Sequence, residues 1–212
     1  DEPASVSLAK TKSERERRSG SGEIPRQRVI PPITQAECLF DVPSGWEWAR
    51  FGDLCLFIEA GWSPKCEERP RIGDEWGVIK ISAVTWGRFN PDENKTLPSN
   101  LEPRTDCEIH SGDFLMSRAN TAELVAKSVV VQQTPPRLML NDKTLRVVFP
   151  SSVDRQYVNL FNNGSIARQY YMRVASGTSE SMRNVSRESV LEMLVPVPPL
   201  SEQKRIVSKV TE

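Results

Sequence analysis

Two short segments of the sequence carry side chains that could bond the base edges of a nucleic-acid duplex. The first is SRANT at 117–121, where Arg118 and Asn120 follow an apolar run and predict an exposed turn after a strand. An arginine fork can donate two hydrogen bonds to guanine, and an asparagine amide can pair with adenine in the same bidentate manner. A second interpretation is that Arg118 only holds the turn, through an ion pair with Asp113 or Glu123.

The second segment is ASGTSESMRN at 175–184, whose glycine, serine and asparagine content predicts a loop between helices. Small hydroxyl side chains and backbone amides can approach a phosphate closely, and an arginine adds positive charge. An ordinary linker is the alternative. The candidate contact residues here are Ser176, Gly177, Thr178, Ser179, Ser181, Arg183 and Asn184.

Three lysines are further candidates for phosphate contacts. Lys80 and Lys127 are expected in strands that line the same face, and Lys65 follows GWSP on an expected loop. Tryptophan is more often packed than used for contact, so the tryptophans of this region are assigned to the core or its rim. They are Trp62, for which stacking is the alternative, Trp76 and Trp86.

Mainly β structure is expected to position these side chains. Apolar, β-branched runs predict strands at 76–84, 124–132 and 144–150, and the segment 113–120 predicts a strand that runs into an exposed turn. A short buried helix is expected within 42–61, two short helices within 157–174, and a further helix that Ser186 caps. The fold class is therefore mixed α/β (α+β), with a twisted, mostly β core and short flanking helices.

The composition allows one sizeable folded domain and argues against several classes of protein. The 212 residues are 38% hydrophobic and 26% charged, which permits a packed core. No apolar run approaches the roughly eighteen residues of a membrane span, and the N-terminus has no apolar signal-peptide core. We therefore expect no membrane contact. Scattered cysteines that stay reduced indicate the cytoplasm.

Charge is balanced overall but unevenly distributed. The chain has 28 basic and 28 acidic residues, so it lacks the net positive charge of many nucleic-acid binders. The segment 118–146 has five basic residues against two acidic ones, a net charge of +3, whereas 91–113 has two against six, a net charge of −4. A positive face toward phosphate and ordinary surface patterning are both compatible with this distribution.

Enzymatic chemistry is poorly supported by the residues. The four cysteines form no C-x-x-C pair and His110 is the single histidine, so we expect no metal, no cofactor and no Ser-His triad. An amino-methyltransferase would need an aromatic-ended Pro-Pro tetrapeptide, to which NPDE at 90–93 is the nearest match. A metal-dependent nuclease could use Asp106, Glu108 and Asp113, but a solvated acidic loop explains these residues better.

The segment PPLSEQKRIVSKV at 198–210 predicts an amphipathic helix at the edge of the domain. Two prolines favour a clean start, Ser201 is placed to cap the helix, and Glu202 suits its positive end. A narrow apolar stripe on such a helix is typical of a coiled-coil surface that meets a partner helix. The stripe consists of Ile206, Val207 and Val210. A helix folded back on its own domain is the alternative.

This segment closely resembles the boundary between a target-recognition domain and a conserved spacer helix in the DNA specificity subunits of type I restriction–modification systems. Six further stretches resemble that family in the family's order: KTKSERERRSGSGEIPRQRVIPPITQAE, FDVPSGWEWARFGDL, WGVIKISAV, SGDFLMSRANT, LMLNDKTLRV and SGTSESMRNVS. One such match would carry little weight, whereas an ordered series over nearly the whole chain is specific.

The resemblance implies a non-catalytic subunit that reads one half of a bipartite DNA site. Its implied partners are double-stranded DNA, methyltransferase subunits that dock on the spacer helices, and restriction subunits outside them. The residues implied to dock the methyltransferase are Glu202, Gln203, Arg205, Ile206, Val207 and Val210. The alternatives are an assembly module that does not read DNA and, with less support, a fragment of a methyltransferase or nuclease.

The resemblance also predicts three regions. Residues 1–35 end a conserved helical spacer and its linker, 36–197 form the target-recognition domain, and 198–212 begin the following helix of a coiled-coil spacer. A chain with one recognition domain is either a fragment of a longer subunit, which the tail at 1–35 favours, or a half-subunit that associates with a second copy. Base contacts should vary between targets, so the resemblance marks scaffold positions and not reading positions.

Overall fold

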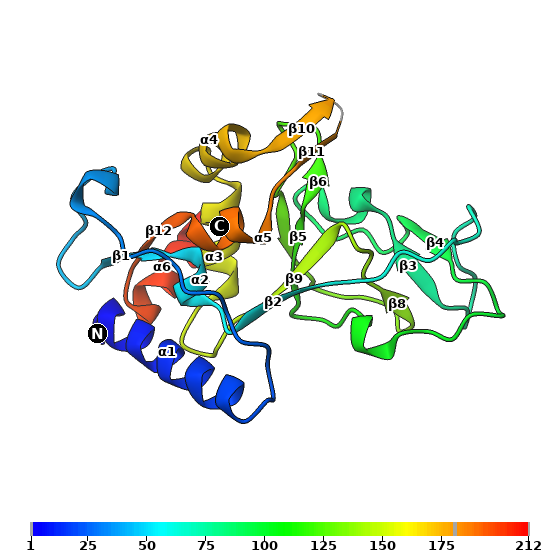
Figure 1. Cartoon of the computed structure of the whole chain (residues 1–212), viewed down its shortest axis with the longest axis horizontal. Coiled ribbons are helices and arrows are strands. Elements are labelled where there is room, and N and C mark those ends of the chain that lie inside the picture. Colours follow the sequence, from blue (N-terminus) through cyan, green and yellow to red (C-terminus); the bar gives the residue numbers. More distant parts are fainter. Residues whose placement is uncertain (1, 180–181, 212) are drawn as a thin grey trace. The chain divides into compact units, whose positions relative to one another are not determined.

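The chain forms two compact units, each built from segments that are not contiguous in the sequence (Figure 1). The computed structural model describes residues 2–179 and 182–211, and only the backbone of residues 178 and 179. Unit 1 comprises Asp1–Phe57, Val148–Tyr170 and Ser186–Glu212, and unit 2 comprises Ile58–Val147 and Tyr171–Val185. The chain therefore leaves unit 1 and returns to it twice.

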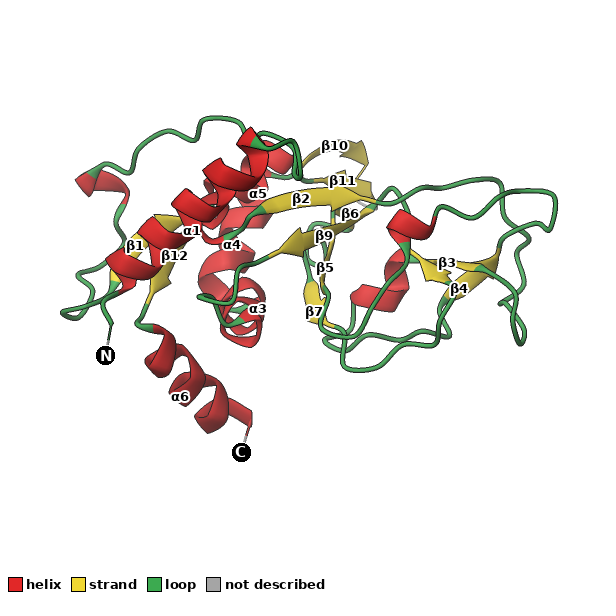
Figure 2. Cartoon of the chain, turned by 90° about the horizontal axis from the view of Figure 1, so that it is seen from below, coloured by secondary structure: helices red, strands yellow, loops and turns green. Residues whose placement is uncertain are grey.

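Unit 1 combines helices with one pair of strands. β1 (Glu47–Arg50) and β12 (Leu194–Val197) pair antiparallel, with Trp48 opposite Pro196 (Figure 2). The helices are α1 (Ala4–Gly20), α2 (Phe51–Leu54), α3 (Arg155–Asn163), α5 (Arg187–Glu192) and α6 (Leu200–Thr211), with the 3-10 helix η1 (Gln35–Glu37). α4 (Ser165–Val174) begins in this unit and ends in unit 2.

Aromatic side chains hold the core of unit 1. The rings of Phe51 and Phe149 meet edge to face with centroids 5.9 Å apart, and both are buried. Tyr157 of α3 is buried as well, and its hydroxyl donates to the carbonyl oxygen of Pro196 at 2.5 Å. This hydrogen bond satisfies the one polar atom of the ring, so α3 is fixed against β12 without an unpaired buried group.

One face of α1, in the region expected to end a conserved helical spacer, packs on the rest of unit 1. The buried side chains, spaced three and four residues apart, are those of Ala4, Ser7 and Thr11. One turn further along, Arg15 donates to the carbonyl oxygens of Gly52 and Cys55 at 2.8 and 2.9 Å. The helix is therefore anchored by small residues and by one arginine that reaches backbone oxygens.

Unit 2 contains small sheets joined by loops and 3-10 helices. One sheet has the order β2 (Phe57–Ala60), β9 (Thr144–Val148), β5 (Phe114–Ser117) and β7 (Ser128–Val130). A second has β4 (Asn94–Thr96), β3 (Gly77–Ile79) and β8 (Leu138–Met139), and a third has β10 (Ser176–Ser179), β11 (Met182–Asn184) and β6 (Ala119–Asn120). The 3-10 helices are η2 (Ile81–Val84) and η3 (Thr105–Cys107).

The apolar faces of these sheets form the core of unit 2. A central cluster of buried residues joins β3, η2, β5, β7 and β8, and a smaller cluster contains Val78, Leu97, Cys107 and Met139. The central cluster consists of Ile79, Ala83, Val84, Ile109, Leu115, Val129, Val131, Leu138 and Leu140. Trp76 packs against the smaller cluster, as the sequence predicts for this tryptophan.

The mixed α/β class and several local expectations are confirmed. α3 and α4 are the two short helices expected within 157–174, and they are separated at Gly164. Ser186 caps α5 by accepting a hydrogen bond from the amide of Ser189 at 3.0 Å. The strands expected at 124–132 and 144–150 are β7 and β9.

Other local expectations are wrong. The short buried helix expected within 42–61 is present only as the single turn α2, and the residues on either side of it form β1 and β2, because EWAR and FIEA find strand partners elsewhere in the chain. The strand expected at 76–84 ends at Ile79 and continues as η2. The loop expected at 175–184 contains the strands β10 and β11, and the turn expected at Asn120 is the strand β6. The cause is the same throughout, since backbone pairing with a distant strand overrides local propensity.

The two units do not follow the three regions expected from the sequence. Unit 1 combines α1 and α6 with parts of the region 36–197, whereas unit 2 lies wholly within that region. The functional division into spacer and recognition regions stays a prediction, because compactness alone does not assign a role to either unit.

Candidate nucleic-acid interface

Two like charges face one another where two antiparallel strands of unit 2 end. β5 and β9 pair as far as Ser117 opposite Thr144, and the next amide, that of Arg118, donates to the carbonyl oxygen of Lys143 at 2.8 Å. The register therefore places Arg118 directly opposite Lys143. Like charges in such positions destabilise a sheet. Their presence is better explained by an anionic ligand than by the fold.

Arg146, and not Arg118, holds the acidic stretch of the sequence. The side chain of Arg146 is 11% exposed and lies 2.5 Å from the carboxylate of Glu59 and 3.2 Å from that of Asp113. It also donates to the carbonyl oxygen of Glu108 at 2.7 Å. The expectation of a solvated acidic loop is therefore wrong for Asp113. Across the described part of the chain, Arg118 has no ion-pair partner.

The hairpin β10–β11 brings the second candidate segment next to the first. Arg183 on β11 lies opposite Asn120 on β6, and the amide of Val185 donates to the carbonyl oxygen of Arg118 at 2.9 Å (Figure 1). Segments far apart in the sequence thus share one small sheet. The candidates that come together in it are Arg118, Asn120, Ser176, Gly177, Arg183 and Asn184.

The side chains in this sheet differ in how many of their hydrogen-bonding groups already have partners within the protein. Asn120 donates to the hydroxyl of Thr85 at 3.3 Å and accepts from the amide of Thr121 at 2.9 Å, so both ends of its amide are engaged. Arg183 donates to the carbonyl oxygen of Gly177 at 3.0 Å. Asn184 is exposed. The geometry favours Arg118 and Asn184 over Asn120 as direct contacts.

Gly177 is required by the shape of this hairpin. Its φ is +141°, and a Cβ there would lie 2.6 Å from the carbonyl oxygen of Met182. The backbone of Thr178 and Ser179 continues β10, while their side chains and the whole of Ser181 lie outside the described residues. The hairpin is thus a close-packed backbone structure with small residues on one strand.

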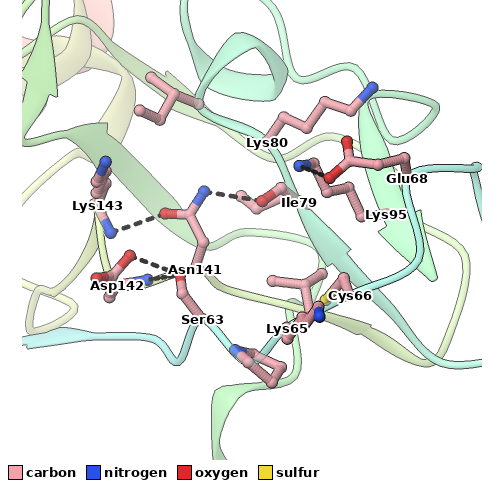
Figure 3. Close-up of a pocket in the computed structure, with 13 residues that line it drawn as sticks. Ser63, Lys65, Cys66, Glu68, Ile79, Lys80, Lys95, Asn141, Asp142 and Lys143 are labelled. Atoms are coloured by element: carbon pink, nitrogen blue, oxygen red, sulfur yellow. Dashed lines mark hydrogen bonds and ion pairs between the residues drawn. The ribbon is translucent and has the colours of Figure 1, made fainter. Parts of the chain in front are cut away.

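Beside Lys143, lysines line a hollow of unit 2 with a cavity volume of about 550 Å³ (Figure 3). Its walls come from the loop after β2, from β3 and its continuation, from β4, and from the β8–β9 connection. The lysines are Lys65, Lys80, Lys95 and Lys143. Sequence reasoning identified Lys65 and Lys80. It missed Lys95 and Lys143, which only the pairing of the strands brings to the same hollow.

Two of these lysines are partly neutralised and two are not. Lys95 lies 2.8 Å from Glu68, and its ammonium group holds the pKa of that carboxyl below the ordinary value. Lys80 is 4.0 Å from Glu93, the limit of an ion pair. Lys65 and Lys143 are exposed, and no described residue forms an ion pair with either. The hollow is therefore lined by four lysines and two carboxylates, those of Glu68 and Asp142, and the Asp142 carboxylate accepts from the hydroxyl of Ser63.

A tight backbone contact fixes the floor of the hollow. Asn141 donates to the carbonyl oxygen of Ile79 at 2.8 Å and accepts from the amide of Lys143 at 2.9 Å (Figure 3). Gly61 packs against Leu140, the residue before Asn141, so closely that a Cβ at position 61 would lie 2.0 Å from the carbonyl oxygen of Leu140. Lys143 is therefore held in place by a buried amide.

The remaining candidates lie at the margins of this surface. Lys127 precedes β7 and is half-buried, and its carbonyl oxygen accepts from the amide of Ser117 at 2.9 Å. Trp62 packs under the guanidinium of Arg104, whose central carbon is 4.8 Å from the ring centroid. Trp86 is 71% exposed, so its assignment to the core or rim is wrong.

The described residues offer no metal centre of three or more His, Cys, Asp or Glu side chains. The cysteines are unpaired thiols, and burial raises the pKa of Cys55 to about 12. None of the described helices is long and apolar enough to cross a membrane. The arrangement in unit 2 can bind an anion and donate hydrogen bonds, which is the chemistry of contact with phosphates and base edges.

Comparison with known proteins gives one consistent answer. No protein-family model matches the sequence. The chain is 34% identical over 214 residues to the type I restriction enzyme EcoEI specificity subunit of Escherichia coli, and the match covers all of the chain and 36% of that protein. It is 25% identical over 219 residues to the EcoAI specificity subunit of the same organism, with the same coverage.

The chain is similar along its whole length to type I restriction enzyme specificity subunits. It spans 36% of the length of the two curated subunits. The fold agrees with the HsdS subunit of Thermoanaerobacter tengcongensis, with a TM-score of 0.56 at 16% identity over 98% of this chain and 44% of that one. A chain from a study of assembly and conformational transition of the type I R-M system gives a TM-score of 0.54 at 18% identity, covering 98% and 45%.

The edge helix α6 is partly folded on unit 1. Gln203 of α6 is 1% exposed, accepts from the amide of Asp154 at 2.9 Å and donates to the carbonyl oxygen of Pro198 at 2.9 Å. Glu202 accepts from the indole of Trp46 at 2.9 Å. Gln203 is therefore removed from the expected docking set, since its amide is used inside the unit.

The same face of α6 becomes exposed toward its end. Ile206 and Val207 are partly buried, Arg205 is exposed, and Val210 is 62% exposed. The helix begins at Leu200, so the expected cap Ser201 lies inside its first turn. The stripe is thus folded back on unit 1 at one end and open to solvent at the other, and its contact with a partner helix stays a prediction.

Proposed function

We propose that this chain binds double-stranded DNA through unit 2 and reads one half of a bipartite target for a type I restriction–modification system. The observation that carries the proposal is the pair Arg118 and Lys143, placed opposite each other without acidic partners. The lysine hollow extends this positive surface on one side, and the β6–β11–β10 sheet extends it on the other.

Different side chains are proposed to contact different parts of the DNA. Lysines are suited to phosphate contacts, which position a protein on the duplex without reading it. Arg118 and Asn184 present the fork and the amide that base edges require. Asn120 supports the sheet from within, because both ends of its amide have partners in the protein. One terminal nitrogen of Arg183 is engaged in the same sheet by the carbonyl oxygen of Gly177.

In this proposal the chain does no chemistry itself and acts in the cytoplasm, where its partners act. Methyltransferase subunits dock on the open end of α6, and restriction subunits bind outside them. Support comes from the family and from the exposed end of the apolar stripe at Val210. Self-association is required only if the chain is a half-subunit.

Selection from a pool of duplexes with a random central stretch tests the proposal. The chain is mixed with its cognate methyltransferase subunits, bound duplexes are recovered, and the enriched sequences are read. We expect one short motif and a binding constant that falls steeply with salt. Recovery of the pool without any enriched motif would favour a scaffold that does not read DNA. Methyl transfer or cleavage by the chain alone would favour an enzyme.

A further inference from the structure

The turn after η2 presents a large aromatic ring to solvent. Trp86 is 71% exposed, whereas the other tryptophans are partly buried. Each of those has a use in packing or hydrogen bonding: Trp46, Trp48, Trp62 and Trp76. Trp86 has no hydrogen-bond or ring partner among the described residues. An indole that is exposed to water does not gain the favourable free energy of burial, which is the usual reason for a tryptophan in a folded protein.

The exposure of Trp86 does not come from a loose loop. The hydroxyl of Thr85 donates to the carbonyl oxygen of Ile81 at 2.8 Å, and the amide of Asn90 donates to the carbonyl oxygen of Ala83 at 2.9 Å. Gly87 turns the chain with a φ of +81°, a conformation that glycine adopts without strain. Both ends of the turn are thus fixed to η2, so the backbone that carries the exposed ring is held in place.

This turn is connected to both halves of the candidate interface. The amide of Asn120 donates to Thr85 at 3.3 Å, which joins the turn to the sheet that carries Arg118. Lys80 of the hollow immediately precedes η2. A 3-10 helix rises about 2 Å per residue, so a residue after η2 lies on the order of 10 Å along the chain from Lys80. Trp86 therefore lies close along the chain to Lys80, in a turn that is bonded to the sheet carrying Arg118.

Charge indicates which ligand the ring meets. Arg88 follows in the same turn, is exposed, and has no ion-pair partner among the described residues. An aromatic ring beside the unpaired cation Arg88 fits a polyanion with flat apolar faces, and nucleic-acid bases offer such faces. A protein partner would need an acidic, apolar surface at the same place, and the surrounding positive groups give no reason to prefer one.

We propose that Trp86 is an aromatic wedge that stacks on a base at a deformable step of the target duplex, with Arg88 on the adjoining phosphate. The inference rests on the proposed DNA-binding function and adds a second means of reading to it. A wedge makes the binding free energy depend on the DNA sequence, because the free energy needed to unstack a base-pair step differs between steps. It does so without hydrogen bonds to base edges. Pyrimidine–purine steps open most easily and are the expected position.

The test uses the whole chain with its methyltransferase subunits and a random duplex pool. Trp86→Ala is expected to enrich a motif that has lost preference at one step. It should bind the duplex selected by the wild type roughly 5- to 150-fold more weakly, the range of a lost base–aromatic stack. Trp86→Phe keeps a stacking ring and should retain most of the affinity. The salt dependence should not change, because Trp86 neutralises no phosphate.

A spectroscopic readout separates stacking from a merely structural role. A selected duplex with 2-aminopurine at the affected step should become brighter when the wild type binds and should not when Trp86→Ala binds. Ile72→Ala is the matched control, because Ile72 is also an apolar residue of unit 2 with 71% exposure. It should bind like the wild type.

The possible outcomes are distinguishable. If the wild type enriches no motif, the proposed function fails and the wedge with it. If the wild type enriches a motif and Trp86→Ala enriches the same one with equal affinity, only the wedge is refuted. Loss of assembly with methyltransferase subunits at unchanged DNA affinity would instead assign Trp86 to a protein contact and also overturns the proposal. Thermal unfolding of each variant confirms that unit 2 is folded.

Discussion

At the scale of single residues, the opposition of Arg118 and Lys143 is the feature that the fold alone does not explain. The strands would be more stable with a neutral residue at either position, since like charges face each other across the pair. Retaining both cations makes sense when a negative group lies between or above them. Residues of this kind lower stability in the free protein and contribute affinity in the complex.

We expect Arg118→Ala and Lys143→Ala each to weaken DNA binding while leaving the fold intact or slightly more stable. If Arg118 contacts a base, its loss should cost about 1–3 kcal/mol and relax the motif at one position. Lys143→Ala should weaken all duplexes alike and reduce the salt slope by about 0.9. Titrations of duplex at several salt concentrations measure both effects.

Lys12→Ala is the control for these two variants, because Lys12 is exposed on α1 of unit 1. Equal loss of affinity in all three variants would show that overall charge, and not this surface, determines binding.

At the scale of elements, Gly61 determines whether the loop after β2 can lie against the β8–β9 connection. A Cβ at Gly61 would overlap the carbonyl group of Leu140, which is backbone and cannot rotate away. We expect Gly61→Ala to lower the free energy of unfolding by about 3 kcal/mol, at the upper end of overpacking costs. Urea unfolding followed by fluorescence measures this. Gly20→Ala should be nearly neutral, since nothing lies within 4 Å of a Cβ there.

The linker before β1 is fixed to unit 1 by a surface ion pair. The amide of Thr34 and the guanidinium of Arg50 hold the pKa of Glu37 at about 2, below its ordinary value of 4.5. A lowered carboxyl pKa stabilises the fold above the ordinary value, and the contribution is lost as the pH falls toward 2.

We therefore expect the difference in thermal midpoint between wild type and Glu37→Gln to be largest near neutral pH. It should shrink as the pH falls from about 4.5 to 2, because the wild-type carboxylate then becomes protonated. Midpoints recorded over that pH range measure the effect. Glu47→Gln, at an exposed position of β1, should show no such trend. A difference that stays constant with pH would contradict the role given to the charge.

How much could be predicted from the sequence depends on whether an element is defined locally. α3 and α4 were predictable because their apolar period and the Asn-Asn-Gly break lie within one short stretch. β10 and β11 were not, since a polar segment becomes a strand only where β6 supplies its backbone partners.

The candidate site follows the same rule. Arg118 and Lys65 can be recognised as candidate contact residues from their residue type and their neighbours in the sequence. Lys143 becomes a candidate only because the register of β5 and β9 places it opposite Arg118. Trp86 was assigned to packing because most tryptophans are packed, and no local signal distinguishes an exposed one. Asn120 has the residue type of a base reader, but its amide bonds Thr85 and Thr121.

At the scale of the whole molecule, α6 separates the two proposed activities. Val210 is 62% exposed, so Val210→Asp should leave the fold and the DNA contacts of the chain unchanged while weakening assembly with methyltransferase subunits. Size-exclusion chromatography of the mixed subunits measures assembly, and duplex titration of the chain alone measures the other property. Lys204→Ala, at another exposed position of α6, is the matched control, because it also lowers the net charge by one. If both variants assemble normally, α6 is not the docking element.

The chain passes from unit 1 to unit 2 and back twice, and this path limits how such a protein can acquire a new specificity. A chimera that takes Ile58–Val147 from a relative would keep its old β10–β11 hairpin, which must then pair with a foreign β6. Grafting Tyr171–Val185 together with the longer segment avoids that mismatch. Natural recombination has the same requirement. A single exchanged segment that contains both parts of unit 2 also contains the residues between them, so α3 and α4 are exchanged together with unit 2.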